Sequence, residues 1–174
     1  MNLKIDNLKN CNEKYFNKAW ELYESSFPIE EKRTKDEQYI ILKKENYNPT
    51  IFIKDEIVVG ILFFWDFDKY IFIEHFAINP LLRSQSYGSI ILEYFLSKYK
   101  NCILEIEQID DEITKKRFNF YKRFDFVINK YKHFQIPFRK DSKKLELLLL
   151  SHKNHLTKFE YEDLYTNMKN HLTI

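Results

Sequence analysis

Hydrophobic residues recur with a helical period near the start of this chain. In residues 13–27 they return at intervals of three and four, which places them on one face of a helix. These residues are Phe16, Ala19, Trp20 and Tyr23. Pro28 ends the helix, because the residue before a proline is pushed out of helical geometry. A second, shorter helix is predicted over residues 35–44.

The pattern then changes to runs of β-branched and aromatic residues, which are typical of strands. Residues 50–54 and 57–65 fit this pattern and flank a short polar turn, so they predict a β-hairpin. Residues 70–78 predict a third long strand after another polar break. Helices followed by successive antiparallel strands indicate a layered arrangement of helices and sheet.

Helical and strand-like segments alternate in the second half of the chain. The predicted elements are a helix over residues 88–100, a strand over 102–106, a helix over 111–124, two strands over 127–137 and 144–151, and an amphipathic helix over 156–172. The complete order predicts an α/β layered domain with a mixed, largely antiparallel sheet. Several folds share that order.

Length and composition favour one globular domain over residues 1–174. The 28 basic and 26 acidic residues leave a net charge of +2, so there is no electrostatic reason to expect nucleic acid or an anionic membrane as a partner. The sequence has no signal-peptide pattern and no apolar run of about 20 residues. We therefore expect a soluble, cytoplasmic protein.

One segment, residues 74–92, has the features of an anion-binding loop. A predicted strand leads through a proline-marked bend and a loop of small polar residues into a predicted helix. Backbone N–H groups and the helix dipole at such a junction favour a phosphate. Gly88 permits a close approach of the backbone, and Arg83 supplies positive charge. An ordinary strand-to-helix connection explains the pattern equally well on these grounds alone.

The run Arg83-Ser84-Gln85-Ser86-Tyr87-Gly88 resembles the pyrophosphate-binding motif of the GNAT acetyltransferases, Arg/Gln-x-x-Gly-x-Gly/Ala. Arg83 and Gly88 match the motif, whereas Ser86 replaces its first glycine. The preceding Phe76-Ala77-Ile78-Asn79-Pro80 is similar to the strand before the loop in that family. Serine still offers its backbone N–H, but its Cβ is expected to crowd the pyrophosphate or to alter the path of the loop.

Segment 117–126 supports the resemblance, because it is similar to the later family signature Phe-Tyr-x-x-x-Gly-Phe. The matching residues are Phe120, Tyr121 and Phe126. Asp125 replaces the glycine, and aspartate tolerates a left-handed turn better than most residues. Thr114 and Arg117 replace the Asn and Ala that are common earlier in this helix. The resemblance extends over residues 51–151.

This resemblance implies a GNAT-like sheet with helices on both faces, splayed between strands 70–78 and 102–106 to admit acetyl-CoA as acyl donor. The residues that it places at the cofactor are Phe76, Ala77, Ile78, Arg83, Ser84, Gln85, Ser86, Tyr87, Gly88, Ser89, Asn119 and Tyr121. A backbone N–H in the splay would stabilise the oxyanion that develops on the thioester carbonyl.

The resemblance further implies direct attack of a primary amine on the thioester in a ternary complex. Tyr121 occupies the position of the family's phenol and is expected to donate to the departing thiolate. Its alternative role is that of a core tyrosine.

Glu74, Glu105 and Glu107 are the candidates for the base that takes the proton from the amine. Glu74 alternates with phenylalanines on its strand, so its pKa is expected to be raised. Glu105 and Glu107 share one face of the next strand. A solvated or salt-bridged strand face is the alternative for these carboxylates.

The remaining reactive residues are expected to have no catalytic role. His75 is expected on the strand face opposite Glu74, either packed or exposed. Cys102 and Cys11 are expected to be free thiols, because they form no metal-type pair and Cys102 has no histidine close in sequence. The spacing of histidines, cysteines and carboxylates predicts no metal site.

The acceptor is left open between a small-molecule amine and a peptide amine. Residues 27–33 and 138–143 are expected to shape its site. The alternative function is a catalytically inactive CoA-binding module with a regulatory or interaction role, which the departures at Ser86, Thr114 and Arg117 favour. Oligomeric state is also open: the apolar strand 145–150 is either core or the seam of a homodimer.

Overall fold

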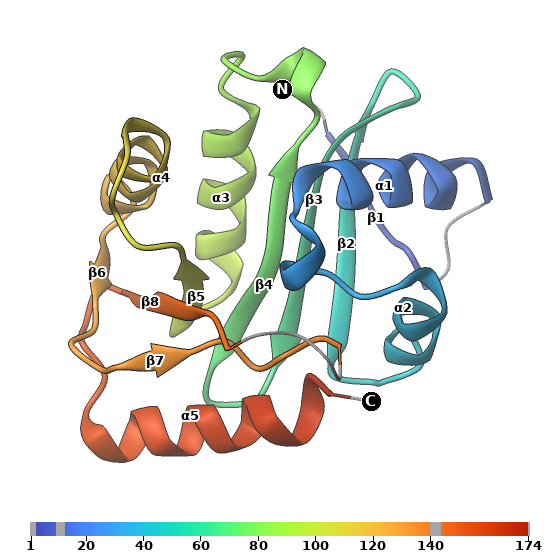
Figure 1. The fold of residues 1–174 in the computed structure, drawn as a ribbon. Coiled ribbons are helices and arrows are strands. Elements are labelled where there is room, and N and C mark those ends of the chain that lie inside the picture. The colour runs from blue at the N-terminus through green and yellow to red at the C-terminus, as the bar shows by residue number, and fades with distance from the viewer. Residues whose placement is uncertain (1–2, 10–12, 140–143, 174) are drawn as a thin grey trace.

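The computed structural model of the protein describes residues 3–9, 13–139 and 144–173. It has a central mixed sheet with helices on both faces (Figure 1). The strands are β1 (Lys4–Asn7), β2 (Tyr47–Lys54), β3 (Ile57–Asp66), β4 (Ile71–Ile78), β5 (Cys102–Ile106), β6 (Phe126–Ile128), β7 (His133–Phe134) and β8 (Glu146–His152). The helices are α1 (Glu13–Ser26), α2 (Lys35–Ile41), α3 (Tyr87–Lys98), α4 (Glu112–Lys122) and α5 (Lys158–His171), with short 3₁₀ turns η1 (Ile29–Glu31) and η2 (Pro80–Leu82).

The strand order is β1-β2-β3-β4-β5-β8-β6, and β7 pairs with β8. Every described pair is antiparallel except β4 with β5, which is parallel. Side chains at three helix starts accept backbone N–H groups in capping boxes, at Thr34, Asp111 and Thr157. The predicted fold class, a mostly antiparallel α/β sheet with helices on both faces, is confirmed.

The predicted strands need two corrections. The strand β1 was not predicted, and residues 127–137 form two short strands rather than one. The buried amide of Asn129 explains the interruption, because it donates to Leu149 O at 3.2 Å and to Ser151 Oγ at 2.8 Å. Its Oδ1 also accepts the backbone N–H of Leu156 at 2.7 Å. A polar corner held by these bonds is more stable here than a continued strand.

Each face of the sheet carries its own hydrophobic core. The core on the side of α1 and α5 contains Ala19, Tyr23, Trp65, Leu164 and Met168. The core on the side of α3 and α4 contains Phe64, Ile91, Leu92, Phe95 and Tyr121. Figure 1 shows α5 running along the end of the sheet opposite the start of α3.

A β-bulge in β4 changes which side chains face each core. The pairing shifts from Phe63 with His75 to Phe64 with Ile73, so Glu74 has no partner in the register. His75 Nδ1 consequently lies 3.3 Å from Glu74 Oε2. The prediction that these two side chains point to opposite faces is therefore wrong, because the extra residue shifts the alternation by one position.

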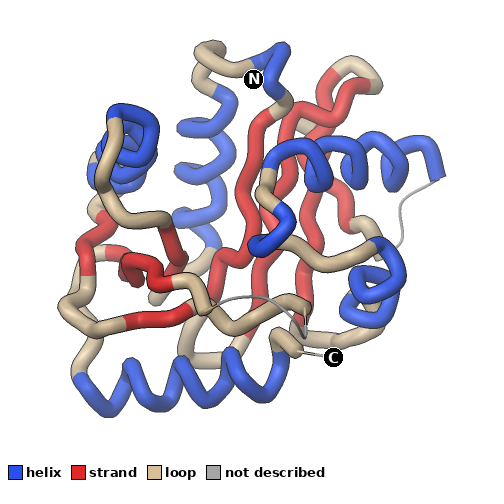
Figure 2. The backbone as a smooth tube through the Cα atoms, in the orientation of Figure 1, coloured by secondary structure: helices blue, strands red, loops and turns tan. Residues whose placement is uncertain are grey.

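The sheet splays between β4 and β5. Among the described residues, their parallel pairing has three registered pairs and ends at Ile73 with Leu104. Beyond that point β4 continues upward past the short β5 (Figure 2). The backbone of β4 from Glu74 to Ile78 thus lacks a neighbour on this side and borders an opening.

Candidate active site

The opening between β4 and β5 contains a cavity of about 600 Å³. A second cavity of about 340 Å³ lies at the start of α3. The residues that line both are Ile78, Arg83, Ser84, Gly88 and Phe120. Because these linings are shared, the two cavities form one cleft that runs from the splayed strands to the loop before α3.

The loop before α3 adopts a conformation that normally favours glycine. Ser84 and Ser86 both have a φ of 63°, and Ser86 is the residue directly before the helix. Ser86 therefore has a left-handed backbone, which costs a residue with a Cβ about 1–2 kcal/mol. The left-handed turn expected at Asp125 is confirmed by its φ of 60°.

Gly88 leaves space in the cleft rather than supplying an unusual backbone angle. A Cβ at this position would lie 3.5 Å from Ile78 Cγ1 and 3.6 Å from Phe120 Cζ. These are ordinary contact distances, so a side chain here would occupy the cleft without breaking the fold.

Arg123 is a cleft residue that the sequence interpretation missed. It follows α4 and lines the cavity at the start of α3 together with Arg83, so two guanidinium groups face one anion-sized space. Its position three residues after Phe120, at the basic end of the helix, was the available signal. Gln85 and Asn119, in contrast, are exposed and line neither cavity.

Glu74 is completely buried in an ion pair with Arg33. The guanidinium donates to both carboxylate oxygens, at 2.8 and 2.7 Å, and Trp65 Nε1 donates to Oε1 at 2.9 Å. Burial by itself would raise the pKa of Glu74, but the Arg33 charge outweighs burial and holds this pKa well below its usual range. The predicted raised pKa is therefore wrong, and Glu74 is not a suitable base.

Arg33 ties this pair to distant parts of the chain. Its Nη2 also donates to Leu172 O at 2.8 Å, and its guanidinium lies 4.4 Å from the centroid of the Phe138 ring. Phe138 belongs to the segment expected to shape the acceptor site, whereas residues 140–143 lie outside the described part of the chain.

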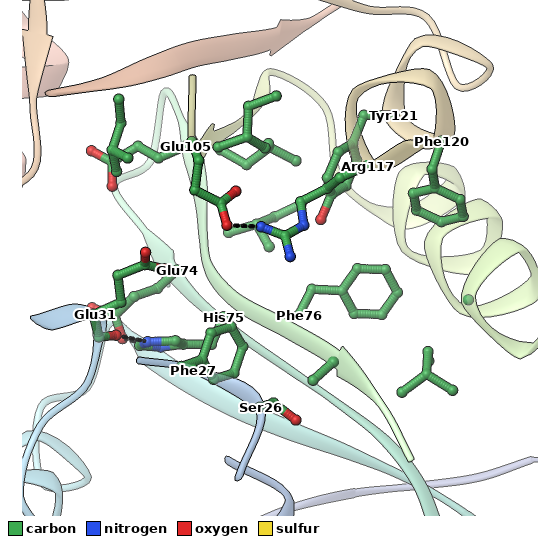
Figure 3. A pocket seen from close by; sticks show the side chains of 18 of the residues that line it. Ser26, Phe27, Glu31, Glu74, His75, Phe76, Glu105, Arg117, Phe120 and Tyr121 are labelled. Carbon is green, nitrogen blue, oxygen red and sulfur yellow. Dashed lines mark hydrogen bonds and ion pairs between the residues drawn. The ribbon is translucent and has the colours of Figure 1, made fainter. Parts of the chain in front are cut away.

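Tyr121 lines the cavity from α4 and is 8% exposed. Burial raises its pKa to about 12, so the phenol keeps its proton near neutral pH. In Figure 3, Tyr121 and Arg117 lie on one side of the cavity and Glu31, Glu74 and His75 on the other, with Phe76 between them. This position allows Tyr121 to donate a hydrogen bond to a group bound in the cleft.

Glu105 and Glu107 line the same cavity, but each has a basic partner. Glu105 Oε1 lies 2.5 Å from His133 Nε2, and His133 Nδ1 lies 3.2 Å from the Tyr161 hydroxyl on α5. Glu107 forms an ion pair with Arg117. The sequence interpretation missed both partners, which come from other elements.

Glu31 is the second cleft residue that was missed. It closes η1, lines the cavity and is half-buried. Burial raises the pKa of Glu31 to about 7, and the nearby carboxylate of Glu107 adds to this effect. Its signal in the sequence was an acidic residue shortly after Pro28, in the loop expected to shape the acceptor site.

Cys102 is a buried free thiol, as predicted, and burial raises its pKa to about 12. It therefore does not form a reactive thiolate near neutral pH. Cys11 lies outside the described residues. Within the described ranges, no group of three or more His, Cys, Asp or Glu residues could hold a metal ion. No described helix is long and apolar enough to cross a membrane.

The sheet is splayed between β4 and β5, and a loop beside the splay leads into α3. This arrangement agrees with the acyltransferase fold that the resemblance predicted. Comparison with known proteins is consistent with this class. The profile of the family described as "Acetyltransferase (GNAT) family" matches residues 12–126. A Bacillus subtilis (strain 168) protein described as "Putative acetyltransferase YjbC" is 33% identical over 156 residues, which cover 80% of this chain and 77% of that protein. The chain therefore belongs to the GNAT acetyltransferase family.

Solved structures agree with this assignment. A GNAT-family protein from Bacteroides thetaiotaomicron has a TM-score of 0.85 and 28% identity, over 97% of this chain and 96% of that chain. A GNAT acetyltransferase from Elizabethkingia anophelis with acetyl-CoA bound has a TM-score of 0.58 and 12% identity, over 88% of this chain and 99% of that chain. The second likeness concerns the fold alone.

Proposed function

We propose that this protein transfers an acetyl group from acetyl-CoA to a primary amine. The observation that carries this proposal is the continuous cleft between the unpaired edge of β4 and the arginine-bearing loop before α3. One end offers positive charge and backbone N–H groups for phosphates, and the other offers a phenol and carboxylates for chemistry.

In this proposal the pyrophosphate binds at the start of α3, near Arg83, Ser84 and Gly88. The pantetheine arm extends along β4 past Phe76 and Ile78, whose backbone lacks a strand partner on that side. A backbone N–H of this edge donates a hydrogen bond to the negative charge that develops on the thioester oxygen. Ser86, Tyr87, Ser89 and Ala77 complete the binding surface.

The reaction needs no covalent enzyme intermediate. The amine nitrogen forms a bond to the thioester carbon, and the C–S bond then breaks with its electron pair on sulfur. Because the pKa of Tyr121 is about 12 and a free thiol titrates near about 8.5, Tyr121 stabilises the thiolate mainly by donating a hydrogen bond. Glu105, held by His133, is placed to orient the amine acceptor, which is a small molecule or a peptide.

The first test is calorimetric titration of the protein with acetyl-CoA and with CoA. Micromolar binding is expected, and Arg83→Ala should weaken it by about tenfold, as loss of a charge-assisted hydrogen bond predicts. Lys98→Ala, at the far end of α3, is the matched control and should bind normally. No binding at millimolar acetyl-CoA contradicts the proposed function.

A second test separates an enzyme from a CoA-binding module without catalysis. Thiol release from acetyl-CoA should depend on an added amine, with n-butylamine and Nα-acetyl-lysine amide as probes. Tyr121→Phe should lower kcat by about 10²-fold while acetyl-CoA binding is retained. Binding without turnover of either amine favours the inactive module.

A further inference from the structure

Four carboxylates line the cavity between β4 and β5, and three of them contact a basic side chain. Glu74 is paired with Arg33, Glu107 with Arg117, and Glu105 lies against His133. The fourth, Glu31, has no hydrogen bond or ion pair from its carboxylate to any other residue that the structure describes. It is thus the carboxylate that is free to take up a proton.

The position of Glu31 is fixed even though its carboxylate is free. His75 Nε2 lies 2.8 Å from the backbone oxygen of Glu31, and the His75 ring packs edge-on against Phe27 at 4.6 Å between centroids. This contact attaches η1 to β4, directly beside the bulge. In Figure 3, Glu31 faces the same space as Tyr121, from the opposite wall.

We propose that Glu31 is the general base that removes the proton from the acceptor amine, an assignment that rests on the proposed acetyltransferase function. A proton moves from the ammonium nitrogen to a carboxylate oxygen of Glu31. The freed electron pair forms the C–N bond, the C–S bond breaks with its electron pair on sulfur, and the second proton lost by the nitrogen passes to the thiolate beside Tyr121. Acid and base then act from opposite walls of one cavity, as a displacement between two bound substrates requires.

The electrostatic surroundings support this assignment. The charged groups near Glu31 are Glu107 just after β5, Arg117 of α4, Glu105 of β5 and Glu30 of its own turn. Burial and the carboxylates outweigh Arg117 and raise the pKa of Glu31 to about 7. A base with a pKa near the working pH combines a sizeable ionised fraction with useful proton affinity.

The test begins with a measurement that needs no acceptor. Carboxyl ¹³C NMR of the full chain labelled on glutamate should show a group that titrates with a midpoint near about 7 and is absent from Glu31→Gln. Titration of Glu31 in the ordinary range near about 4.3 overturns the proposal. Glu30→Gln, one residue away, is the matched control and should keep the signal.

Kinetics then test the role of that carboxyl. With acetyl-CoA and n-butylamine, kcat of the wild type should rise with pH through a midpoint near about 7, and Glu31→Gln should lose about 10²-fold and this dependence. Glu107→Gln should move the midpoint to lower pH, because it removes a neighbouring negative charge and leaves Arg117 unpaired. A base remote from Glu107 would not respond in this way.

The outcomes distinguish the two levels of the proposal. Acetyl-CoA should bind Glu31→Gln and the wild type equally well, which also shows that the variant is folded. Failure of the wild type to bind acetyl-CoA, or to turn over either amine, counts against the proposed function and with it this assignment. Normal turnover with an unchanged rate and pH profile in Glu31→Gln overturns the assignment of Glu31 alone.

Discussion

Single residues of the loop before α3 hold a backbone conformation that is unfavourable for their side chains. Ser86 has a φ of 63° directly before α3, at the position where the family motif has glycine. The serine side chain is therefore held on a left-handed backbone, which is a strained conformation for a residue with a Cβ. The same holds for Asp125 after α4, where φ is 60°.

Ser86→Gly should relieve this strain. We expect the free energy of unfolding to rise by about 1 kcal/mol, with acetyl-CoA binding equal to or tighter than that of the wild type. Urea unfolding and calorimetry provide the two measurements. Ser89→Gly, inside the helix, is the control and should lose about 0.5–1 kcal/mol instead. Destabilisation by Ser86→Gly would show that the serine side chain stabilises the loop.

Glu74→Gln should test the buried pair with Arg33. Leaving the guanidinium without its partner should cost about 3–5 kcal/mol at pH 7 in urea unfolding. The pKa of Glu74 is lowered in the folded state, so its contribution is present above the ordinary value near about 4.3 and is lost as pH falls below it. The difference between wild type and variant should therefore shrink toward pH 3. Glu21→Gln, in an exposed pair with Lys18, should change stability by less than about 0.5 kcal/mol.

At the scale of elements, the bulge and the splay of β4 create the cleft. The bulge brings Glu74 and His75 to one side, where they contact Arg33 and η1. The splay leaves the same stretch of backbone open toward β5. One irregular strand therefore serves both the buried ion pair and the opening next to it.

The two glycines of the chain should respond differently to alanine. A Cβ on Gly60 would lie 2.9 Å from Ala77 O of β4, so Gly60→Ala must shift this strand and should cost about 1–3 kcal/mol. Gly88→Ala should keep its stability, because its Cβ meets ordinary contact distances, yet it should weaken acetyl-CoA binding by narrowing the cleft. Thermal unfolding and calorimetry on both variants measure this contrast, and equal stability losses would contradict it.

At the scale of the whole molecule, α5 packs on the core and also contacts residues that lie beside the cleft. Leu164, Met168 and Leu172 are at most 1% exposed, and the Leu172 carbonyl accepts from Arg33. Tyr161 of the same helix contacts His133, which holds Glu105. Removal of this helix would therefore disturb both the core and the site.

A chain shortened to residues 1–155 should lose cooperative unfolding and acetyl-CoA binding, because it exposes the core side chains that α5 covers. Calorimetric unfolding and near-ultraviolet circular dichroism measure the loss. Phe159→Ser, at an α5 position that is 73% exposed, is the control and should change stability by less than about 0.5 kcal/mol. A sharp, native-like transition in the shortened chain would show that α5 is peripheral.

The sequence by itself determined most elements and the fold class, and it supplied the motif on which the proposed phosphate loop rests. Helical and strand periods, proline and glycine positions and the run Arg83-Ser84-Gln85-Ser86-Tyr87-Gly88 are local signals, and local backbone preferences respond to them. The same signals placed Tyr121 and Glu105 on elements that line the cleft.

Only the tertiary structure decided the surroundings, and hence the proton affinity, of Glu74 and Glu31. The bulge at Glu74 arises from the pairing of β4 with β3. Arg33, which forms the ion pair with Glu74, lies 41 residues away in sequence. Glu31 gains its raised pKa from burial and from the carboxylates of Glu107 and Glu105, which lie still further away along the chain. Proton affinity depends on nearby charge and on exclusion of water, and both are set by packing between elements rather than by the order of residues within them.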